Sequence, residues 1–532
     1  MGKALSGLCF VPVFALMAIL LFSRIDRHAV DLPFSDQWYT LTPVLTGAGP
    51  LELFVCQYGP HRQGLGALLT KAVAAATDLN LRAESFAIGV VSCLACAVAL
   101  LLTRRVRGRF AWTDAVIPLL FLTPLQWEAV TGVPNPAHGV VPLLLLIVLA
   151  RAFSIRGRWR YPAVLGLEFA LVFTGFGVFA GVAVVGILLL ELIRDTRRRD
   201  ARGVVHGCVA SLCAGAIAGS FLLGYEFAPA VPEFRFPDPN WPRYLLLIAR
   251  ARANVVCVRG AAADGIGLVL LAAAVWTVTV QARALVRSSA TEYSRPGTAV
   301  LLTTGFSVLF CANVAIGRMS LGVDAGMVSR YVPLLIPLFF GLYLQATQLP
   351  PRIRFPVLGL TLGLHVLGSV GSLEQTNAAA AAFHDTKLAW RDAFLDGGSI
   401  AAADAAARSS IHPEGLVDAR ERTDDLSRKL AFLETHRLSL FRDHAIRYPT
   451  DPRLVGTWRP AGWSGSEHDL LRADGTYRMG TRRPAETGRW RTAHGELQLR
   501  AAGSMSWQSL GDYRVSDSSV TLERSGLRWE RD

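Results

Sequence analysis

A chain of 532 residues with 52% hydrophobic and only 18% charged residues is too apolar for an ordinary soluble protein. Its net charge of +13 first suggests a nucleic-acid-binding protein. Residues 372–532 hold 23 basic and 23 acidic residues, however, so the whole excess lies in residues 1–371. The basic residues there gather in short loops between apolar segments, which indicates a membrane protein and no nucleic-acid partner.

Apolar runs long enough to cross a bilayer predict about eleven transmembrane helices. The runs are 5–22, 84–103, 112–127, 138–153, 161–175, 177–193, 204–225, 265–281, 297–316, 331–346 and 354–371. If the first helix leads outward, the arginine-rich stretches at 104–109, 151–160 and 194–202 all fall inside. We therefore expect a mainly α-helical, polytopic bundle over residues 1–371, with the N-terminus inside and the C-terminus outside. Residues 161–193 could form two thin helices or a re-entrant pair around the turn at 174–177.

Polar side chains that could carry chemistry occur in three of the predicted outer segments. The first segment contains Asp36 and, about 25 residues later, His61 and Arg62. Glu128 follows the third apolar run. The loop between the ninth and tenth runs contains Arg318, Arg330 and Tyr331. The predicted topology places all these residues on the same side of the membrane.

An acid in the first outer loop, directly after the first helix, resembles the bacterial GT-C-type glycosyltransferases, which take sugars from polyprenyl-phosphate donors. Asp36 occupies that place, and the resemblance covers residues 1–371. It implies a multi-pass protein of the bacterial cytoplasmic membrane that transfers sugar to an envelope glycan, lipid or protein. Many members carry two adjacent acids in this loop, whereas Gln37 and Trp38 follow here. The sequence therefore offers no paired-acid motif for a divalent cation; such a cation stays possible, and no cofactor is certain.

The resemblance and the chemistry of inverting glycosyl transfer together assign roles. A carboxylate must take the proton of the acceptor hydroxyl, and cations must stabilise the departing phosphate. Asp36 suits the catalytic role, and the arginines suit the phosphate. The predicted substrate-binding residues are His61, Arg62, Glu128, Arg318, Arg330 and Tyr331.

Each of these residues also has a structural interpretation. Asp36 could cap a surface helix over residues 37–46, and His61 with Arg62 could begin a solvated helix after Pro60. Glu128 could simply end the third span beside an interfacial tryptophan. Arg318 and Arg330 could pair with Asp324 in their own loop.

A different class of function rests on Glu168, near the middle of the fifth apolar run. An acid inside the membrane is costly unless it is paired or hydrated, so it suggests a polar pathway. The alternative to an enzyme is therefore a transporter or flippase. A non-catalytic envelope assembly protein with an extracytoplasmic binding domain is the other non-enzymatic possibility.

The remaining chain is predicted to lie outside the membrane as two parts. Residues 372–448 are alanine-rich and charged and are predicted to be helical. Residues 449–532 alternate short strand-like runs with glycine turns, which predicts a small antiparallel sheet or β-barrel. With Gly456-Thr-Trp458 and Asp474-Gly-Thr-Tyr477, this part resembles small lipocalin-like domains. It could bind a glycan, lipid or protein, or it could be a folded cap.

Overall fold

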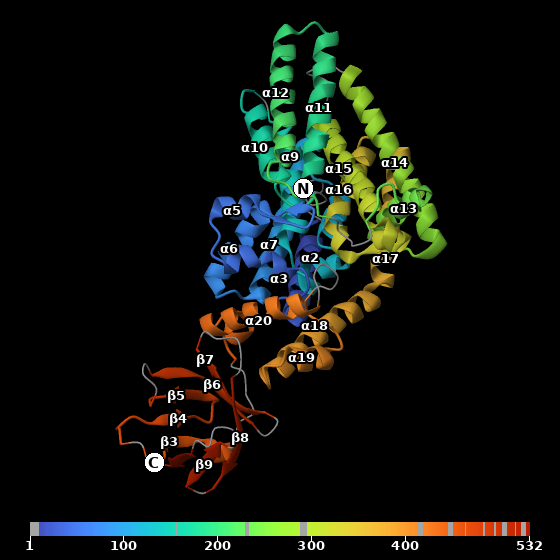
Figure 1. Cartoon of the computed structure of the whole chain (residues 1–532). Helices are drawn as coiled ribbons and strands as arrows, with labels where there is room; N and C mark the ends of the chain where they lie inside the picture. The colour runs from blue at the N-terminus through green and yellow to red at the C-terminus, as the bar shows by residue number, and fades with distance from the viewer. Residues whose placement is uncertain are drawn as a thin grey trace. The chain divides into compact units, whose positions relative to one another are not determined.

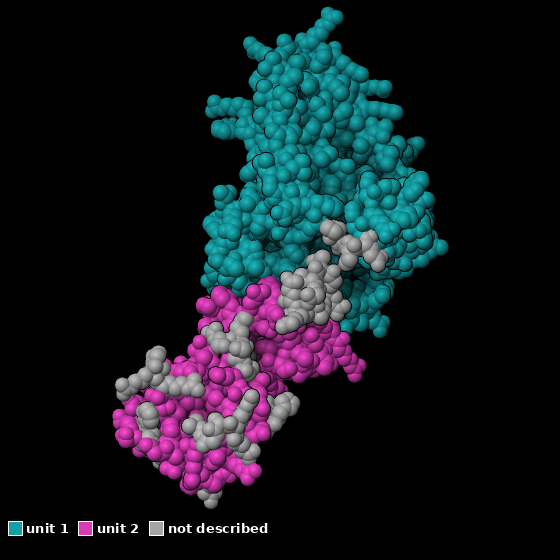
Figure 2. All heavy atoms as spheres, viewed as in Figure 1, with its two compact units in different colours: residues 1–29, 35–77, 81–384 teal, residues 30–34, 78–80, 385–532 magenta. Residues whose placement is uncertain are grey.

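The computed structural model describes residues 10–155, 157–228, 234–287, 295–412, 419–444, 451–462, 464–481, 485–493, 496–502, 508–516, 518–522 and 528–531. The chain forms two compact units, which are coloured separately in Figure 2. Unit 1 comprises residues 1–29, 35–77 and 81–384, and unit 2 comprises residues 30–34, 78–80 and 385–532.

Unit 1 is built from α-helices, many of them apolar (Figure 1). Its helices are α2 (Phe10–His28), α3 (Gln37–Thr40), α4 (Thr42–Leu45), α5 (Pro50–Val55), α6 (Gly64–Thr77), α7 (Leu81–Arg107), α8 (Val116–Phe121), α9 (Val140–Ala152), α10 (Arg160–Val172), α11 (Val178–Arg197), α12 (Ala201–Ser220), α13 (Tyr244–Ala253), α14 (Gly260–Arg287), α15 (Arg295–Arg318), α16 (Val332–Thr347) and α17 (Pro351–Gly371).

Five helical segments of the described chain are long and apolar enough to cross a membrane. They are Leu81–Arg107, Ala201–Ser220, Gly260–Arg287, Pro296–Leu321 and Pro351–Gly371. Ten of the eleven predicted runs correspond to one α-helix each, although residues 5–9 of the first run lie outside the described residues. Several helices are short, with 13 residues in α9 and in α10. The helical membrane fold is therefore present, while the count of eleven spans and their orientation stay predictions.

The exception is the run at 112–127, which is predicted to be a single span and does not form one continuous helix. A 3₁₀ turn at Trp112–Ala115 leads into α8, which has only six residues, and a second 3₁₀ turn covers Pro124–Gln126. Pro124 begins that turn, and the Thr123 hydroxyl accepts a hydrogen bond from the amide of Leu125. Proline lacks the amide donor that a continuing helix needs, so the apolar run is broken.

For the stretch at 161–193 the sequence allows two thin helices or a re-entrant pair. The structure forms two helices there, α10 and α11, joined by a short turn at residues 173–177. Gly175 adopts φ +40°, and a Cβ there would lie 2.2 Å from the carbonyl oxygen of Ala137. The amide of Gly175 donates a 2.7 Å hydrogen bond to the carbonyl of Arg62. The turn is thus attached to the first predicted outer segment.

The core of unit 1 surrounds α16, which is apolar on all sides and almost entirely buried. Its partner is α15, which packs along it. Gly341 permits this close approach, because a Cβ there would lie 2.4 Å from the hydroxyl oxygen of Thr304. Fully buried phenylalanines at positions 121, 306, 310, 339 and 340 fill the surrounding space.

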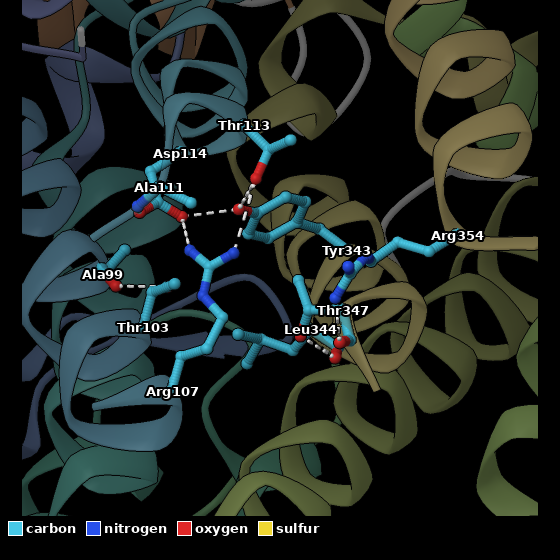
Figure 3. Close-up of polar contacts among 10 residues, drawn as sticks. All are labelled: Ala99, Thr103, Arg107, Ala111, Thr113, Asp114, Tyr343, Leu344, Thr347 and Arg354. Atoms are coloured by element: carbon cyan, nitrogen blue, oxygen red, sulfur yellow. Dashed lines mark hydrogen bonds and ion pairs between the residues drawn. The ribbon is translucent and has the colours of Figure 1, made fainter. Parts of the chain in front are cut away.

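A buried polar network ties the end of α7 to α16 (Figure 3). The carboxylate of Asp114 accepts hydrogen bonds from the Arg107 guanidinium, from the Tyr343 hydroxyl at 2.5 Å and from the Ala111 amide at 2.7 Å. Arg107 also reaches the hydroxyl of Thr113 at 3.4 Å. Asp114 is fully buried, so this Asp114 network satisfies a charge that would otherwise be costly.

Unit 2 begins with helices, in the part that was predicted to be helical. They are α18 (Leu373–Leu395), of which residues 385–395 belong to the unit, α19 (Ile400–Ala407) and α20 (Ala419–His436). Two short segments from earlier in the chain belong to this unit. The Ser439 hydroxyl donates to Asp31 at 3.1 Å, and the Arg442 guanidinium lies 3.5 Å from the same carboxylate.

The remainder of unit 2 is a closed eight-stranded antiparallel barrel. Its strands are β3 (Gly456–Pro460), β4 (Asp469–Leu471), β5 (Thr476–Met479), β6 (Glu486–Ala493), β7 (Glu496–Ala501), β8 (Gln508–Val515), β9 (Ser519–Leu522) and β10 (Arg528–Arg531). Each strand pairs with the next, and β10 closes on β3 with Trp529 opposite Pro460. Trp458, Tyr477 and Trp490 are buried inside the barrel. The predicted barrel is confirmed. Both interpretations of its role, a folded cap and a binding module, stay predictions.

Candidate functional site

Asp36 stands at the start of α3, where the sequence allowed a helix cap. The helix is present, but the Asp36 side chain makes no capping hydrogen bond. Its Oδ1 accepts a 2.9 Å hydrogen bond from the hydroxyl of Tyr58, and its side chain is 33% exposed. Burial and the Asp36 charge raise the pKa of Tyr58 well above its usual range. Tyr58 therefore stays a neutral donor that positions the carboxylate.

Arg330 lies between two carboxylates. Its Nη1 is 3.8 Å from Asp36 Oδ2 and 3.7 Å from Glu128 Oε1, and its side chain is 36% exposed. Burial alone would lower the pKa of Arg330, but Glu128 and Asp36 raise it overall, so the guanidinium stays charged. Both distances exceed hydrogen-bond length, and no described residue accepts a hydrogen bond from the guanidinium. Its donors are therefore available to a ligand.

Glu128 is attached to the Arg330 segment by backbone contacts. It begins a π-helical turn, Glu128–Gly132, and its Oε2 accepts a 3.3 Å hydrogen bond from the Arg330 amide. The hydroxyl of Ser329 accepts from the Glu128 amide at 3.3 Å and donates to the carbonyl of Leu125 at 2.6 Å. Burial raises the pKa of Glu128, and the charge of Arg330 opposes this rise. Glu128 thus holds the arginine in place.

Two histidines adjoin these charges. The ring of His61 lies 4.9 Å from that of His138 in an edge-on arrangement and 4.1 Å from that of Phe176. Burial, His138, Arg318 and Arg330 together hold the pKa of His61 well below its usual range. His61 is therefore neutral at pH 7. The charges of Arg318 and Arg330 both contribute to this lowered pKa.

Arg318 and Tyr331 are the other predicted residues of the loop between the ninth and tenth apolar runs, and their surroundings differ. Arg318 ends α15. Tyr331 is buried, with its ring edge-on to Phe310 at 5.7 Å, so it supports the segment that carries Arg330. The sequence allows Asp324 as a partner for both Arg318 and Arg330. Its Oδ1 instead accepts a 2.8 Å hydrogen bond from Arg250, so it does not explain the position of Arg330.

Arg62 was predicted to bind substrate, and the structure does not place it in this cluster. Residues 57–62 form a β-hairpin of β1 (Gln57–Tyr58) and β2 (His61–Arg62), and not a helix beginning after Pro60. Side chains alternate across a strand, so Arg62 points away from the face that carries His61. Its guanidinium donates to the carbonyls of Val55 at 2.7 Å, Phe221 at 2.9 Å and Leu223 at 2.5 Å. Arg62 is a structural residue.

Sequence reasoning missed three residues here: Tyr58, the partner of Asp36, and His138 with its hydrogen-bond partner Gln63. The amide of Gln63 donates a 3.0 Å hydrogen bond to Nε2 of His138. The Gly-Pro pair between Tyr58 and His61 was the available signal, because it is typical of a tight turn. A hairpin there places Tyr58 opposite His61.

Glu168 lies in α10, away from the cluster just described, and its side chain is fully buried. Neither carboxylate oxygen has a hydrogen-bond partner among the described residues. Val164 and Val172 are buried on the same helix, and a Cβ at Gly181 would lie 3.5 Å from its Oε1. These described neighbours are apolar, and the transport alternative stays a prediction.

We call Asp36, Tyr58, His61, Glu128, His138 and Arg330 the Asp36 cluster. It combines a partly exposed carboxylate, a guanidinium with unused donors and neutral imidazoles. Such a set can accept a proton, bind an anion and bind hydroxyl groups. Within the described parts of the chain, no three His, Cys, Asp or Glu side chains are grouped to hold a metal ion.

The fold and this cluster define a helical membrane protein with a charged site and a C-terminal β-barrel. No protein-family model matches the chain, and no curated protein matches its sequence. Among solved structures it is similar to ArnT from Cupriavidus metallidurans bound to undecaprenyl phosphate, with 15% identity and a TM-score of 0.37. The match covers 83% of this chain and 74% of ArnT. At this TM-score the likeness equates no individual residues.

Proposed function

We propose that this protein is a GT-C-type glycosyltransferase that moves a sugar from a polyprenyl-phosphate donor to an envelope acceptor. The reaction would take place at the Asp36 cluster, on the outer face of the bacterial cytoplasmic membrane. Undecaprenyl phosphate, the lipid in the ArnT structure, is a polyprenyl phosphate of the kind that would leave once the sugar is transferred.

The single observation that supports this most is the position of Arg330 beside Asp36. The guanidinium adjoins the carboxylate at 3.8 Å without a direct hydrogen bond, while Tyr58 holds the other carboxylate oxygen. A phosphate needs donors that are not already used, and a base needs a free oxygen. Both requirements are met by side chains that come from separate parts of the chain.

The proposed step is a displacement at the anomeric carbon of the donor sugar. The acceptor oxygen forms a bond to this carbon, the bond to the phosphate oxygen breaks, and its electron pair leaves with the phosphate. Asp36 takes the proton of the acceptor hydroxyl, and Arg330 with Arg318 stabilises the departing phosphate. Glu128 keeps Arg330 charged and in place.

The test is sugar transfer from a radiolabelled polyprenyl-phosphate sugar in membranes that contain the full chain. Asp36→Asn should reduce transfer about 10²–10⁴-fold, the usual contribution of a general base. The matched control is Asp26→Asn. Asp26 is an exposed acid paired with Arg82 at 2.5 Å, and its loss should leave transfer unchanged. Equal transfer by the Asp36→Asn variant and the unmodified protein, at equal abundance, would refute the proposed role of Asp36.

A further inference from the structure

The histidines of the Asp36 cluster are not explained by phosphate binding, because neutral imidazoles suit hydroxyl groups better than a phosphate dianion. We infer that His61 and His138 form the subsite for the hydroxyl groups of the transferred sugar, with Gln63 selecting the tautomer of His138. This inference rests on the proposed function and adds to it the residues that distinguish a sugar-bearing lipid from a bare lipid phosphate.

The tautomer of His138 follows from its contact with Gln63. An amide nitrogen can only donate, so Nε2 of His138 must accept, and the ring proton of the neutral imidazole is then on Nδ1. No described residue forms a hydrogen bond with that Nδ1 or with either ring nitrogen of His61, and none of these atoms is fully buried without a partner. The pair therefore offers at least two donors and one acceptor, which is the complement that sugar hydroxyls require.

The imidazoles are held by aromatic packing. The buried ring of Phe176 lies 4.1 Å from that of His61, and Phe310 stands edge-on to Phe176 at 4.9 Å. The guanidinium of Arg330 lies beside Asp36 and Glu128, so the cationic part and the imidazole part of the cluster are different side chains. The low pKa of His61 keeps its imidazole from becoming a third cation at neutral pH.

Gln63 has no substrate role in this arrangement and is a positioning residue. It is buried, and it lines a polar pocket together with Gln37, Thr70 and Glu84. Replacing Gln63 by glutamate keeps the side-chain shape but reverses the hydrogen bond. A carboxylate can only accept, so Nε2 of His138 must then carry the proton and donate it in the hydrogen bond. His138 then loses its Nδ1 donor or becomes charged.

The experiment measures lipid binding to the purified full chain by native mass spectrometry. The probes are polyprenyl monophosphate and the same lipid phosphate carrying a hexose, a pentose or an N-acetylhexosamine. The unmodified protein should bind one sugar-bearing lipid at least 10-fold more tightly than the bare phosphate. His138→Ala and Gln63→Glu should each reduce this preference about 10-fold, the value of one or two hydrogen bonds, and leave affinity for the bare phosphate within twofold.

Arg330→Gln is the matched comparison, because it should weaken both kinds of lipid equally. The inference is overturned if the unmodified protein prefers none of the three sugars. It is also overturned if both the His138→Ala and Gln63→Glu variants keep the preference. In either case the proposed function stands if the unmodified protein binds the bare lipid phosphate and the Arg330→Gln variant binds it more weakly. Absence of all lipid binding to the unmodified protein would instead contradict the proposed function itself.

Discussion

Unit 1 contains two clusters with the same three kinds of side chain: an aspartate, an arginine and a tyrosine. In the Asp114 network the carboxylate is fully buried and accepts three hydrogen bonds, and Tyr343 contacts it at 2.5 Å. In the Asp36 cluster the carboxylate is one-third exposed, and its arginine is 3.8 Å away. The first has satisfied its charges internally, whereas the second has unused donors and acceptors. The comparison separates a structural network from a site that can bind a ligand.

The two clusters are associated with opposite ends of α7. Glu84, in the first turn of this helix, lines a pocket with Gln37, the residue after Asp36. Arg107 is the last residue of the helix. At 1.5 Å per residue these ends are about 35 Å apart, close to the thickness of a bilayer. This separation is long enough to cross a bilayer, and which end lies inside stays a prediction.

The largest expected difference between the clusters is in stability. Asp114→Asn should destabilise the protein by about 3–5 kcal/mol, because it leaves the Arg107 guanidinium without its counter-ion in a mostly buried position. Asp36→Asn should change stability by less than about 1 kcal/mol, since its ion pair is long and partly exposed. Thermal unfolding of both variants in detergent checks this. Equal destabilisation by the two substitutions would contradict the distinction between a structural network at Asp114 and a binding site at Asp36.

Sugar transfer, in contrast to stability, should depend on Arg330 of the Asp36 cluster. Arg330→Gln should reduce sugar transfer about 100-fold or more, the typical loss when one donor to a developing negative charge is removed. Arg82→Gln, which removes an exposed arginine paired with Asp26, is the matched control and should have no effect on transfer. A similar loss in both variants would point to general electrostatics and against a phosphate contact at Arg330.

The tyrosines extend the comparison at a smaller scale. Tyr343→Phe removes a buried donor to Asp114 and should reduce the free energy of unfolding by about 1–3 kcal/mol. Tyr58→Phe should leave stability nearly unchanged and reduce transfer several-fold, because the Asp36 carboxylate loses its positioning donor. Stability and transfer rates measured on the same two preparations decide between these outcomes.

The last prediction concerns pH and lies in unit 2. Lys387 is buried against the ring of Phe34, and burial lowers its pKa to about 7 from an ordinary value near 10.5. Between these values the unfolded chain binds more protons, so stability should rise with pH from 7 to 10, by at most about 1.4 kcal/mol per unit. Hydrogen exchange of α18 amides measures this rise, and Lys387→Met should abolish it. A rise that persists in the variant would assign it to another group.

Much of the helical layout and part of the Asp36 cluster could be predicted from sequence. Apolar runs of membrane-crossing length mark helices, and topology alone placed Asp36, Glu128 and Arg330 on one side. The break at Pro124 was missed because the surrounding residues are uniformly apolar, and length was the only criterion. Arg62 was misjudged because its direction depends on a two-residue strand, which is too short to produce a visible pattern. The contact of Gln63 with His138 joins residues 75 positions apart, and no local pattern indicates such a pair.

The most direct test of the account is mass spectrometry of the lipid that co-purifies with the full chain. We expect the unmodified protein and the Arg82→Gln variant to retain a polyprenyl-phosphate lipid, and the Arg330→Gln variant to lose it while remaining folded. Equal retention of that lipid by the Arg330→Gln variant, or its absence from the unmodified protein, would contradict the claim that the Asp36 cluster binds a lipid phosphate.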